Sequence, residues 1–328
     1  MKDILNQLFE HKSLDKETAR NILTNLARGK YNHSQVAAFL TVYLMRSITV
    51  EELEGFREAM LDLCIRLDLD GHDAIDLCGT GGDGKDTFNI STTASFIVAG
   101  AGQKVAKHGN NGVSSACGSS NLLAHFGYSF TNERDKLLRQ IDEAGICFLH
   151  APLFHPAMKN VAPIRKDLGV KTFFNMLGPM VNPSFPDKQL AGVFNLELLR
   201  LYAYLFQNQQ KSFVVLHSLD GYDEISLTGP FKVIGPDGEK IYQPEELGFT
   251  KHAPSDLSGG GSIEESARIF LNLLEGKGTK AQNEVAIANA GFALYCAGKG
   301  TLEESIAKAK ESLESGMALQ KFKKLINQ

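Results

Sequence analysis

The stretch Asp76–Ser119, DLCGTGGDGKDTFNISTTASFIVAGAGQKVAKHGNNGVSSACGS, predicts the fold class of this chain. An apolar run that ends at Cys78 indicates a buried strand, and four glycines follow it within six residues. An Ala-rich segment that ends near Gly100 indicates a helix. In a strand, glycine turn and helix arrangement, backbone N–H groups and the positive end of the helix face a common point. The stretch therefore predicts an α/β fold with an anion-binding turn.

A second polar cluster follows the next expected strand, 104–106. It consists of Lys107-His108-Gly109-Asn110 and the nearby serines Ser114, Ser115 and Ser119. Carboxyl ends of parallel strands meet at one edge of a sheet, so both clusters are expected at the same ligand-binding edge. A lysine neutralises phosphate charge and hydroxyl groups donate to phosphate oxygens. We therefore favour a phosphate-rich substrate over the alternative of a solvated lysine and a structural histidine.

Four further residues allow two interpretations on the sequence alone. Asp223 and Glu224 follow an expected strand at 213–216, and such a loop can be merely solvated or can bind Mg²⁺ together with substrate phosphates. Arg165 can be a surface charge or a bidentate carboxylate ligand. His155, just before Pro156, can be a substrate contact or a helix-entry residue.

Bulk properties exclude several classes of protein. The chain has 328 residues and a formal net charge of -4, which disfavours a nucleic-acid-binding protein with a broad basic face. Its five cysteines contain no CxxC pair and suggest neither a disulfide framework nor a zinc site. The N-terminal residues do not resemble a signal peptide, and no apolar run is long enough for a membrane span. We expect a cytoplasmic protein without a membrane or nucleic-acid partner.

The periodicity of apolar residues predicts two domains. Residues 1–70 show helical spacing only, and they predict a small helical domain to which the segment around 165–185 is a candidate addition. Residues 71–328 predict a large α/β domain with a mainly parallel central sheet. Expected strands are 74–78, 104–106, 146–149, 189–193 and 213–216. Expected helices are 93–101, 121–126, 133–144, 156–168 with a break at Pro163, 196–207, and two late helices after Ser262 and Thr301, whereas the sequences around Asp237-Gly238 and 259–261 indicate surface loops.

The motifs GTGGDG (79–84), NIST (89–92) and KHGN (107–110) resemble those of the anthranilate phosphoribosyltransferase family. The resemblance continues through HPAMKNVAPIRKDLG (155–169), FFNMLGPMVNP (173–183) and GYDE (221–224), and it spans nearly the whole chain. It implies a small helical domain hinged to an α/β domain of the nucleoside phosphorylase type. It also implies a Mg²⁺-dependent enzyme of tryptophan biosynthesis that forms a homodimer through the helical domain. Such an enzyme would transfer the phosphoribosyl group of phosphoribosyl pyrophosphate to the amino group of anthranilate.

The resemblance also implies roles for individual residues of this chain. Lys107, Arg165, Asp223 and Glu224 would be catalytic, and Ser91, Asp223 and Glu224 would bind Mg²⁺. The anthranilate site would contain Gly79, His108, Asn110, His155 and Arg165. The phosphoribosyl pyrophosphate site would contain Gly79, Gly82, Asp83, Thr87, Asn89, Ile90, Ser91, Thr92, Lys107, His108, Gly109, Asn110, Asn111, Gly112, Val113, Ser114, Ser115 and Ser119.

Two other functions are possible for such a chain. A pyrimidine nucleoside phosphorylase of the same fold would be expected to carry a further C-terminal domain and a different sequence after its KH pair. A non-catalytic relative that binds nucleic acid should have an eroded glycine turn, missing carboxylates and a basic surface, none of which this sequence shows. The transferase is therefore the function that the sequence favours.

Overall fold

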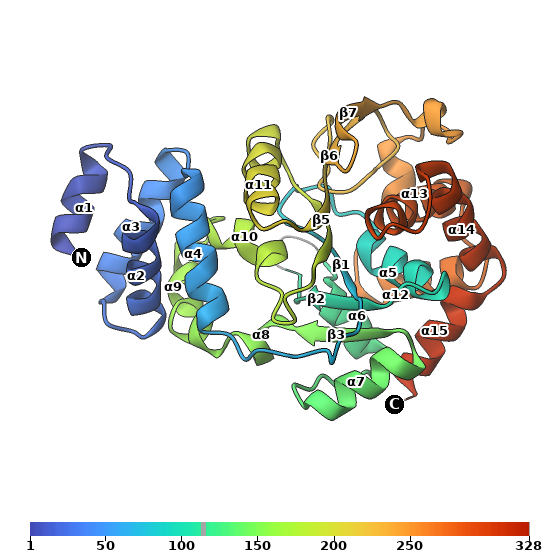
Figure 1. Cartoon of the computed structure of the whole chain (residues 1–328), viewed down its shortest axis with the longest axis horizontal. Helices are drawn as coiled ribbons and strands as arrows, with labels where there is room; N and C mark the ends of the chain where they lie inside the picture. Colours follow the sequence, from blue (N-terminus) through green and yellow to red (C-terminus); the bar gives the residue numbers. More distant parts are fainter. Residues whose placement is uncertain (113–115, 328) are drawn as a thin grey trace.

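A seven-stranded sheet forms the centre of the computed structural model, which describes residues 1–112 and 116–327 (Figure 1). The strand order is β3-β2-β1-β4-β5-β6-β7, in which β1 to β5 are parallel and the last two strands are antiparallel. The bounds are β1 Ile75–Gly79, β2 Val105–Gly109, β3 Ile146–His150, β4 Lys188–Gly192, β5 Ser212–Ser218, β6 Phe231–Gly235 and β7 Gly238–Tyr242. The mainly parallel sheet confirms the predicted fold class.

The alternation of side chains along the strands buries both faces of the sheet. Val214 and Leu216 of β5 belong to one hydrophobic cluster, whereas Phe213 and Val215 belong to another. Successive side chains of a strand point to opposite faces, so an almost continuous apolar run is what a sheet covered on both sides requires. Each face is accordingly covered by helices.

The first face packs against α5 and the C-terminal helices, at the right of Figure 1. The second face packs against α11 and, near β3, against α7. The bounds of the helices in this part of the chain are α5 Ile90–Gly100, α6 Ser119–His125, α7 Arg134–Glu143, α8 Ala151–Phe154, α11 Leu196–Asn208, α12 Ile263–Leu274, α13 Lys280–Cys296, α14 Leu302–Glu314 and α15 Met317–Ile326. Short 3-10 turns lie at η1 Pro156–Asn160, η2 Gly178–Met180, η3 Pro244–Leu247 and η4 Pro254–Leu257.

Four N-terminal helices form a separate layer at the left of Figure 1: α1 Lys2–Phe9, α2 Lys16–Ala27, α3 His33–Met45 and α4 Val50–Asp62. The capping box predicted at Thr49 and Glu52 begins α4. Two later helices, α9 Ala162–Leu168 and α10 Phe174–Leu177, lie beside them. Phe173 stacks on Phe56 with 4.5 Å between ring centroids, which ties the segment before α10 to the N-terminal helices. The exact domain boundary at residue 70 stays a prediction.

Several elements after β5 differ from the sequence-based expectation. The residues around Asp237-Gly238 are not only a surface loop, because they connect the antiparallel strands β6 and β7. An Asp-Gly pair is a sequence signal for a tight hairpin turn, which explains this connection. Helices α13 and α15 were also not predicted. Elsewhere the predicted helix 156–168 is interrupted as expected, because η1 ends before Val161 and Pro163 lies in the first turn of α9.

The order in which the chain adds strands to the sheet reverses between β1 and β4. The chain builds β1, β2 and β3 outward on one side and then returns to place β4 on the other side of β1. At such a switch point the connections leave in opposite directions, so a crevice opens beyond the carboxyl ends of the two strands. The glycine turn and the Asp223-Glu224 loop both reach this crevice.

Candidate active site

A cavity of about 340 Å³ lies at this edge of the sheet. Most of the predicted site residues line it: Gly79, Gly82, Asp83, Thr87, Asn89, Ile90, Ser91, Thr92, Lys107, His108, Gly109, Asn110, Asn111, Gly112, Ser119, Arg165, Asp223 and Glu224. Val113, Ser114 and Ser115 lie outside the described residues. His155 is not among the residues that line the cavity, and its substrate role stays a prediction.

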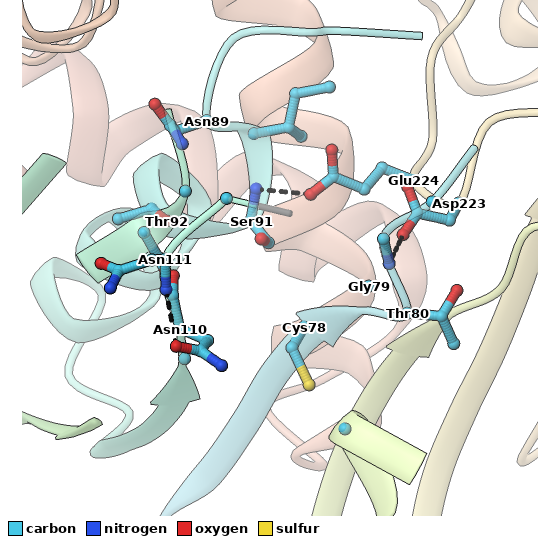
Figure 2. Close-up of a pocket in the computed structure, with 18 of the residues that line it drawn as sticks. Cys78, Gly79, Thr80, Asn89, Ser91, Thr92, Asn110, Asn111, Asp223 and Glu224 are labelled. Carbon is cyan, nitrogen blue, oxygen red and sulfur yellow. Dashed lines mark hydrogen bonds between the residues drawn. The ribbon is translucent and has the colours of Figure 1, made fainter. Parts of the chain in front are cut away.

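The N-terminus of α5 and the Asp223-Glu224 turn are in direct contact at the cavity (Figure 2). The backbone N–H of Ser91 donates to Glu224 Oε1 at 2.8 Å. The backbone N–H of Gly81 donates to Asp223 Oδ2 at 2.6 Å. Burial, the largest cause, raises the pKa of Glu224 to about 7 and raises the pKa of Asp223 well above its ordinary value. A bound cation would remove this penalty, because it favours the charged form of both carboxyl groups.

This carboxylate pair fits Mg²⁺ better than a metal that needs a complete protein cage. Over residues 1–112 and 116–327, no group of three or more His, Cys, Asp and Glu side chains is arranged to hold a metal ion. Mg²⁺ usually keeps several waters and takes one or two protein carboxylates together with substrate phosphates. The donor set present, two carboxyl groups and the Ser91 hydroxyl beside the glycine turn, matches that requirement.

Gly79 and Gly192, called the floor glycines below, lie directly against Asp223. Gly79 and Gly192 are register partners at the carboxyl ends of β1 and β4. A Cβ atom on Gly79 would lie 2.2 Å from Asp223 Oδ2, and one on Gly192 would lie 1.6 Å from the Asp223 carbonyl oxygen. Real side-chain contacts are much longer, so only glycine at both positions lets the carboxylate turn approach the strands.

Lys107 brings a buried amine to the cavity from the middle of β2. Its Nζ atom donates to the Leu77 carbonyl oxygen at 2.6 Å, and the residue is only 1% exposed. Burial lowers the pKa of Lys107, whereas burial raises the pKa of nearby Asp76. The amine has donor capacity beyond the single bond to Leu77, and phosphate oxygens would use it.

Arg165 reaches the cavity from α9 on the helical side. Its Nη2 atom donates to Asn175 Oδ1 at 3.3 Å, and its guanidinium carbon lies 5.2 Å from the centroid of the Phe174 ring. Burial lowers the pKa of Arg165, but an arginine keeps its charge at neutral pH. Asn175 Oδ1 also accepts from the Thr172 N–H at 3.0 Å, so the amide that orients Arg165 is itself fixed. The arrangement suits a planar anion such as a carboxylate.

His108 and His155 form a buried pair beside the cavity. Their ring centroids are 5.3 Å apart, with His108 bonded to the Gly178 carbonyl oxygen and His155 to the Val181 carbonyl oxygen. The other ring nitrogen of each has no partner within the described residues. Burial, the largest cause for both, lowers the pKa of His108 to about 3 and of His155 to about 4. Both imidazoles are therefore neutral at pH 7.

These neutral histidines predict a loss of stability in acid. An unfolded histidine has a pKa of about 6.5, so below that pH the unfolded chain binds protons that the folded chain does not. Their contribution is present above pH 6.5 and is lost as the pH falls toward the folded values, by about 2.5 kcal/mol per histidine at about pH 4.5. Asp223 and Glu224, whose pKa values are raised, contribute to the pH dependence with the opposite sign over the same range, so the test is the difference between wild type and a variant. In urea unfolding at about pH 7 and about pH 4.5, His155→Gln should lose less stability on acidification than wild type, by about the contribution of one histidine. The exposed control His33→Gln should keep the wild-type slope, and an equal slope in both variants would contradict the assignment.

Several residues that shape the site were not predicted. Phe174, Asn175 and Gly178 line the cavity, and Gly192 lies beneath it. Thr80 and Gly81, which also line it, belong to the predicted glycine turn but were not named as individual site residues. In the sequence, the letters FFN and LGP stand out only as part of a resemblance. No local pattern marks Gly192, since it occupies the end of an ordinary buried strand.

Among the helices that the structure describes, none combines the length and apolar character needed to cross a bilayer.

Comparisons with known proteins agree with this geometry. Residues 2–64 match the model of the glycosyl transferase family, helical bundle domain, and residues 71–319 match that of the glycosyl transferase family, a/b domain. Anthranilate phosphoribosyltransferase of Christiangramia forsetii is 59% identical over 325 residues, 99% of this chain and 98% of the relative. The corresponding enzyme of Flavobacterium johnsoniae is 61% identical with the same coverage.

Solved structures give the same result. The crystal structure of anthranilate phosphoribosyltransferase from Thermus thermophilus superposes with a TM-score of 0.92 at 34% identity, over 98% of each chain. The Saccharomyces cerevisiae enzyme in complex with PRPP and Mg superposes with a TM-score of 0.90 at 28% identity, over 98% of this chain and 96% of that one. This chain therefore belongs to the anthranilate phosphoribosyltransferase family.

Proposed function

We propose that this chain transfers the phosphoribosyl group from 5-phosphoribosyl 1-pyrophosphate to the amino group of anthranilate, in tryptophan biosynthesis. The products are N-(5-phosphoribosyl)anthranilate and pyrophosphate. The observation that carries the proposal is one cavity at the sheet switch point, lined by the glycine turn, the Lys107 amine, the Asp223-Glu224 pair and the Arg165 guanidinium. These groups supply donors and counter-charges for a polyphosphate and for a carboxylate.

The donor substrate is held by the groups at the carboxyl edge of the sheet. The glycine turn, the N-terminus of α5 and Lys107 bind the phosphates through N–H donors and one positive charge. Asp223, Glu224 and Ser91 would hold Mg²⁺, which would supply positive charge to the pyrophosphate leaving group. Because breakage of the C1–O bond leaves oxocarbenium character on the ribose, stabilisation of the leaving group is the main electrostatic task.

The acceptor substrate requires positioning more than proton transfer. The amino group of anthranilate is neutral at pH 7 and can attack C1 with inversion, as the C1–N bond forms and the C1–O bond to pyrophosphate breaks. The nitrogen becomes acidic once it is bonded to C1 and gives its proton to the departing pyrophosphate, so no strong base is needed. Arg165 binds the carboxylate of anthranilate, and Asn110 contacts the same molecule. The neutral His108 lies along the path by which anthranilate enters the site. Closure of the helical layer onto the cavity would exclude water, which competes for the same electrophilic carbon.

The direct test measures product fluorescence with anthranilate and phosphoribosyl pyrophosphate, with and without Mg²⁺. Mg²⁺-dependent formation of phosphoribosylanthranilate is expected. A parallel reaction with thymidine and inorganic phosphate tests the nucleoside phosphorylase alternative. Phosphorolysis of thymidine without transfer to anthranilate would contradict the proposal.

A substitution at Arg165 tests the acceptor site separately. Arg165→Ala removes the carboxylate ligand and should raise KM for anthranilate about 100-fold or more, since a charge-assisted bond to a buried ligand is worth about 3 kcal/mol. KM for phosphoribosyl pyrophosphate should change much less. The exposed Arg139→Ala is the control and should leave both constants unchanged. An equal rise of both KM values in Arg165→Ala would remove Arg165 from the anthranilate site.

We also infer that the chain forms a homodimer through its helical layer and works in the cytoplasm. Met45 at the end of α3 is 84% exposed, Leu44 is 46% exposed and Phe9 at the end of α1 is 58% exposed, which gives this layer an unusually apolar surface. All five cysteines are free thiols, as a reducing compartment allows. Sedimentation of Met45→Glu against wild type tests the dimer, because a charge at a buried interface should shift the variant toward monomer.

A further inference from the structure

Helix α13 carries a buried amide that the proposed mechanism does not use. Asn289 is 2% exposed, and its chain neighbours Ala288 and Ala290 are fully buried. An amide in an apolar interior is unfavourable unless its hydrogen-bonding groups are satisfied. The bonds that Asn289 makes therefore indicate why the position is polar.

Asn289 hydrogen-bonds the backbone of Ile225, the residue after Glu224. Its Oδ1 atom accepts from the Ile225 N–H at 3.1 Å, and its Nδ2 atom donates to the Ile225 carbonyl oxygen at 2.9 Å. A second bond from Nδ2 to the Val285 carbonyl oxygen, at 2.8 Å, fixes the side chain on α13. The amide thus pairs with a single residue in both directions, as one strand pairs with another.

The other side of the carboxylate turn is held as well. Ser218 Oγ donates to the Glu224 carbonyl oxygen at 2.7 Å. Leu227 has a φ of 56°, in the left-handed region that non-glycine residues seldom adopt. The His252 N–H donates to the Leu227 carbonyl oxygen at 2.9 Å, so the turn is held after Ile225 as well, whereas Asn289 holds Ile225 itself.

We propose that Asn289 is a positioning residue that fixes the Glu224 carboxylate for divalent-cation binding. This inference rests on the metal role of Asp223 and Glu224 in the proposed function. Helix α13 packs against α5, and the Ser91 N–H of α5 donates to Glu224. Asn289, Ser91 and both carboxylates also line one small hollow behind the cavity. One helix pair therefore sets the distance between Glu224 and the N-terminus of α5.

The test compares Asn289→Ala with wild type by calorimetric titration of phosphoribosyl pyrophosphate at increasing Mg²⁺. Alanine suits a helix, so α13 should persist. Without Mg²⁺, the affinity of Asn289→Ala for phosphoribosyl pyrophosphate should stay within about twofold of wild type, because the phosphate contacts are untouched. The increase in affinity that Mg²⁺ produces should be about tenfold or more smaller than in wild type, as for other residues that orient metal ligands. The Mg²⁺ concentration for half-maximal turnover should rise by the same factor.

Gln103→Ala is the matched control. Gln103 is 1% exposed, and its Nε2 atom donates to the carbonyl oxygens of Asp73 at 2.7 Å and Lys104 at 3.0 Å. These residues precede β1 and β2, at the opposite edge of the sheet from the cavity. Both substitutions remove a buried amide that bonds the backbone, although the Lys104 carbonyl oxygen also accepts from the Ile75 N–H at 3.0 Å. Only Asn289→Ala should alter the Mg²⁺ dependence. Asn289→Leu, which keeps the number and branching of the side-chain heavy atoms, gives the same comparison if the alanine variant does not fold.

The possible results separate this inference from the proposed function. A full wild-type gain from Mg²⁺ in a folded Asn289→Ala or Asn289→Leu chain would overturn the role of Asn289 alone. An equal loss of the gain in Gln103→Ala would show that any buried amide has this effect and would also overturn it. If the wild-type protein binds phosphoribosyl pyrophosphate with the same affinity with and without Mg²⁺, both the metal role of the carboxylate pair and this inference are overturned.

Discussion

A chain that carries Asp223→Asn together with Glu224→Gln should fold normally and lose Mg²⁺-dependent turnover by about 1,000-fold or more, or about 4 kcal/mol of transition-state stabilisation. The amide oxygens can still accept from the Gly81 and Ser91 N–H groups. Removal of two adjacent buried carboxyl groups also removes a desolvation penalty, so the melting temperature should not fall. Turnover against Mg²⁺ concentration, together with thermal unfolding, measures both expectations.

The control for this variant removes two adjacent charges elsewhere. Glu245 and Glu246 are exposed residues of η3, and Glu245→Gln with Glu246→Gln removes the same number of carboxyl groups. Its turnover should equal that of wild type. Mg²⁺-dependent turnover within about tenfold of wild type in the Asp223/Glu224 variant would remove the pair from the metal site.

The parts of the fold that local sequence determines were predictable. A parallel strand covered on both faces is an apolar run bounded by turn residues, so β1 to β5 were found within a few residues of their bounds. The capping residues Thr49, Ser262 and Thr301 each begin a helix as expected, because their side chains accept an N–H of the first turn. The polar clusters at strand ends were placed at one cavity because parallel strands must end at the same edge.

The parts that depend on distant contacts were not predictable in the same way. Helix α13 is apolar nearly all round, which is typical of a helix buried in the core, and its alanines lack the one-sided stripe of a surface helix. Strand β7 is exposed along most of its length and has no apolar face to reveal it. Gly192 and Asn289 act on a turn that is distant from them in sequence, and only the folded chain brings the three together.

Alanine at the two floor glycines should have effects that differ in kind. Gly79→Ala places a Cβ atom 2.2 Å from the end of the Asp223 side chain, which can rotate away. The protein should fold with little loss of stability, but a carboxylate displaced by about 1 Å should lower kcat/KM about 100-fold. Gly192→Ala places its Cβ atom 1.6 Å from the Asp223 carbonyl oxygen, and backbone must move to admit it. It should lower both the melting temperature and kcat/KM, the latter by more than Gly79→Ala does.

Steady-state kinetics and thermal unfolding of the two variants, with Gly261→Ala as control, test this geometry. The nearest atom to a Cβ on Gly261 is Glu265 Oε2 at 3.7 Å, an ordinary contact, so that variant should behave as wild type. A Gly192→Ala chain with unchanged stability would contradict the close approach of the turn to β4. The two floor glycines are register partners on β1 and β4, the strands between which the sheet changes direction. The reversal of strand order between β1 and β4 therefore opens the crevice at the active site. Because Gly79 and Gly192 have no side chains there, the Asp223 carboxylate, from the loop after β5, can enter it.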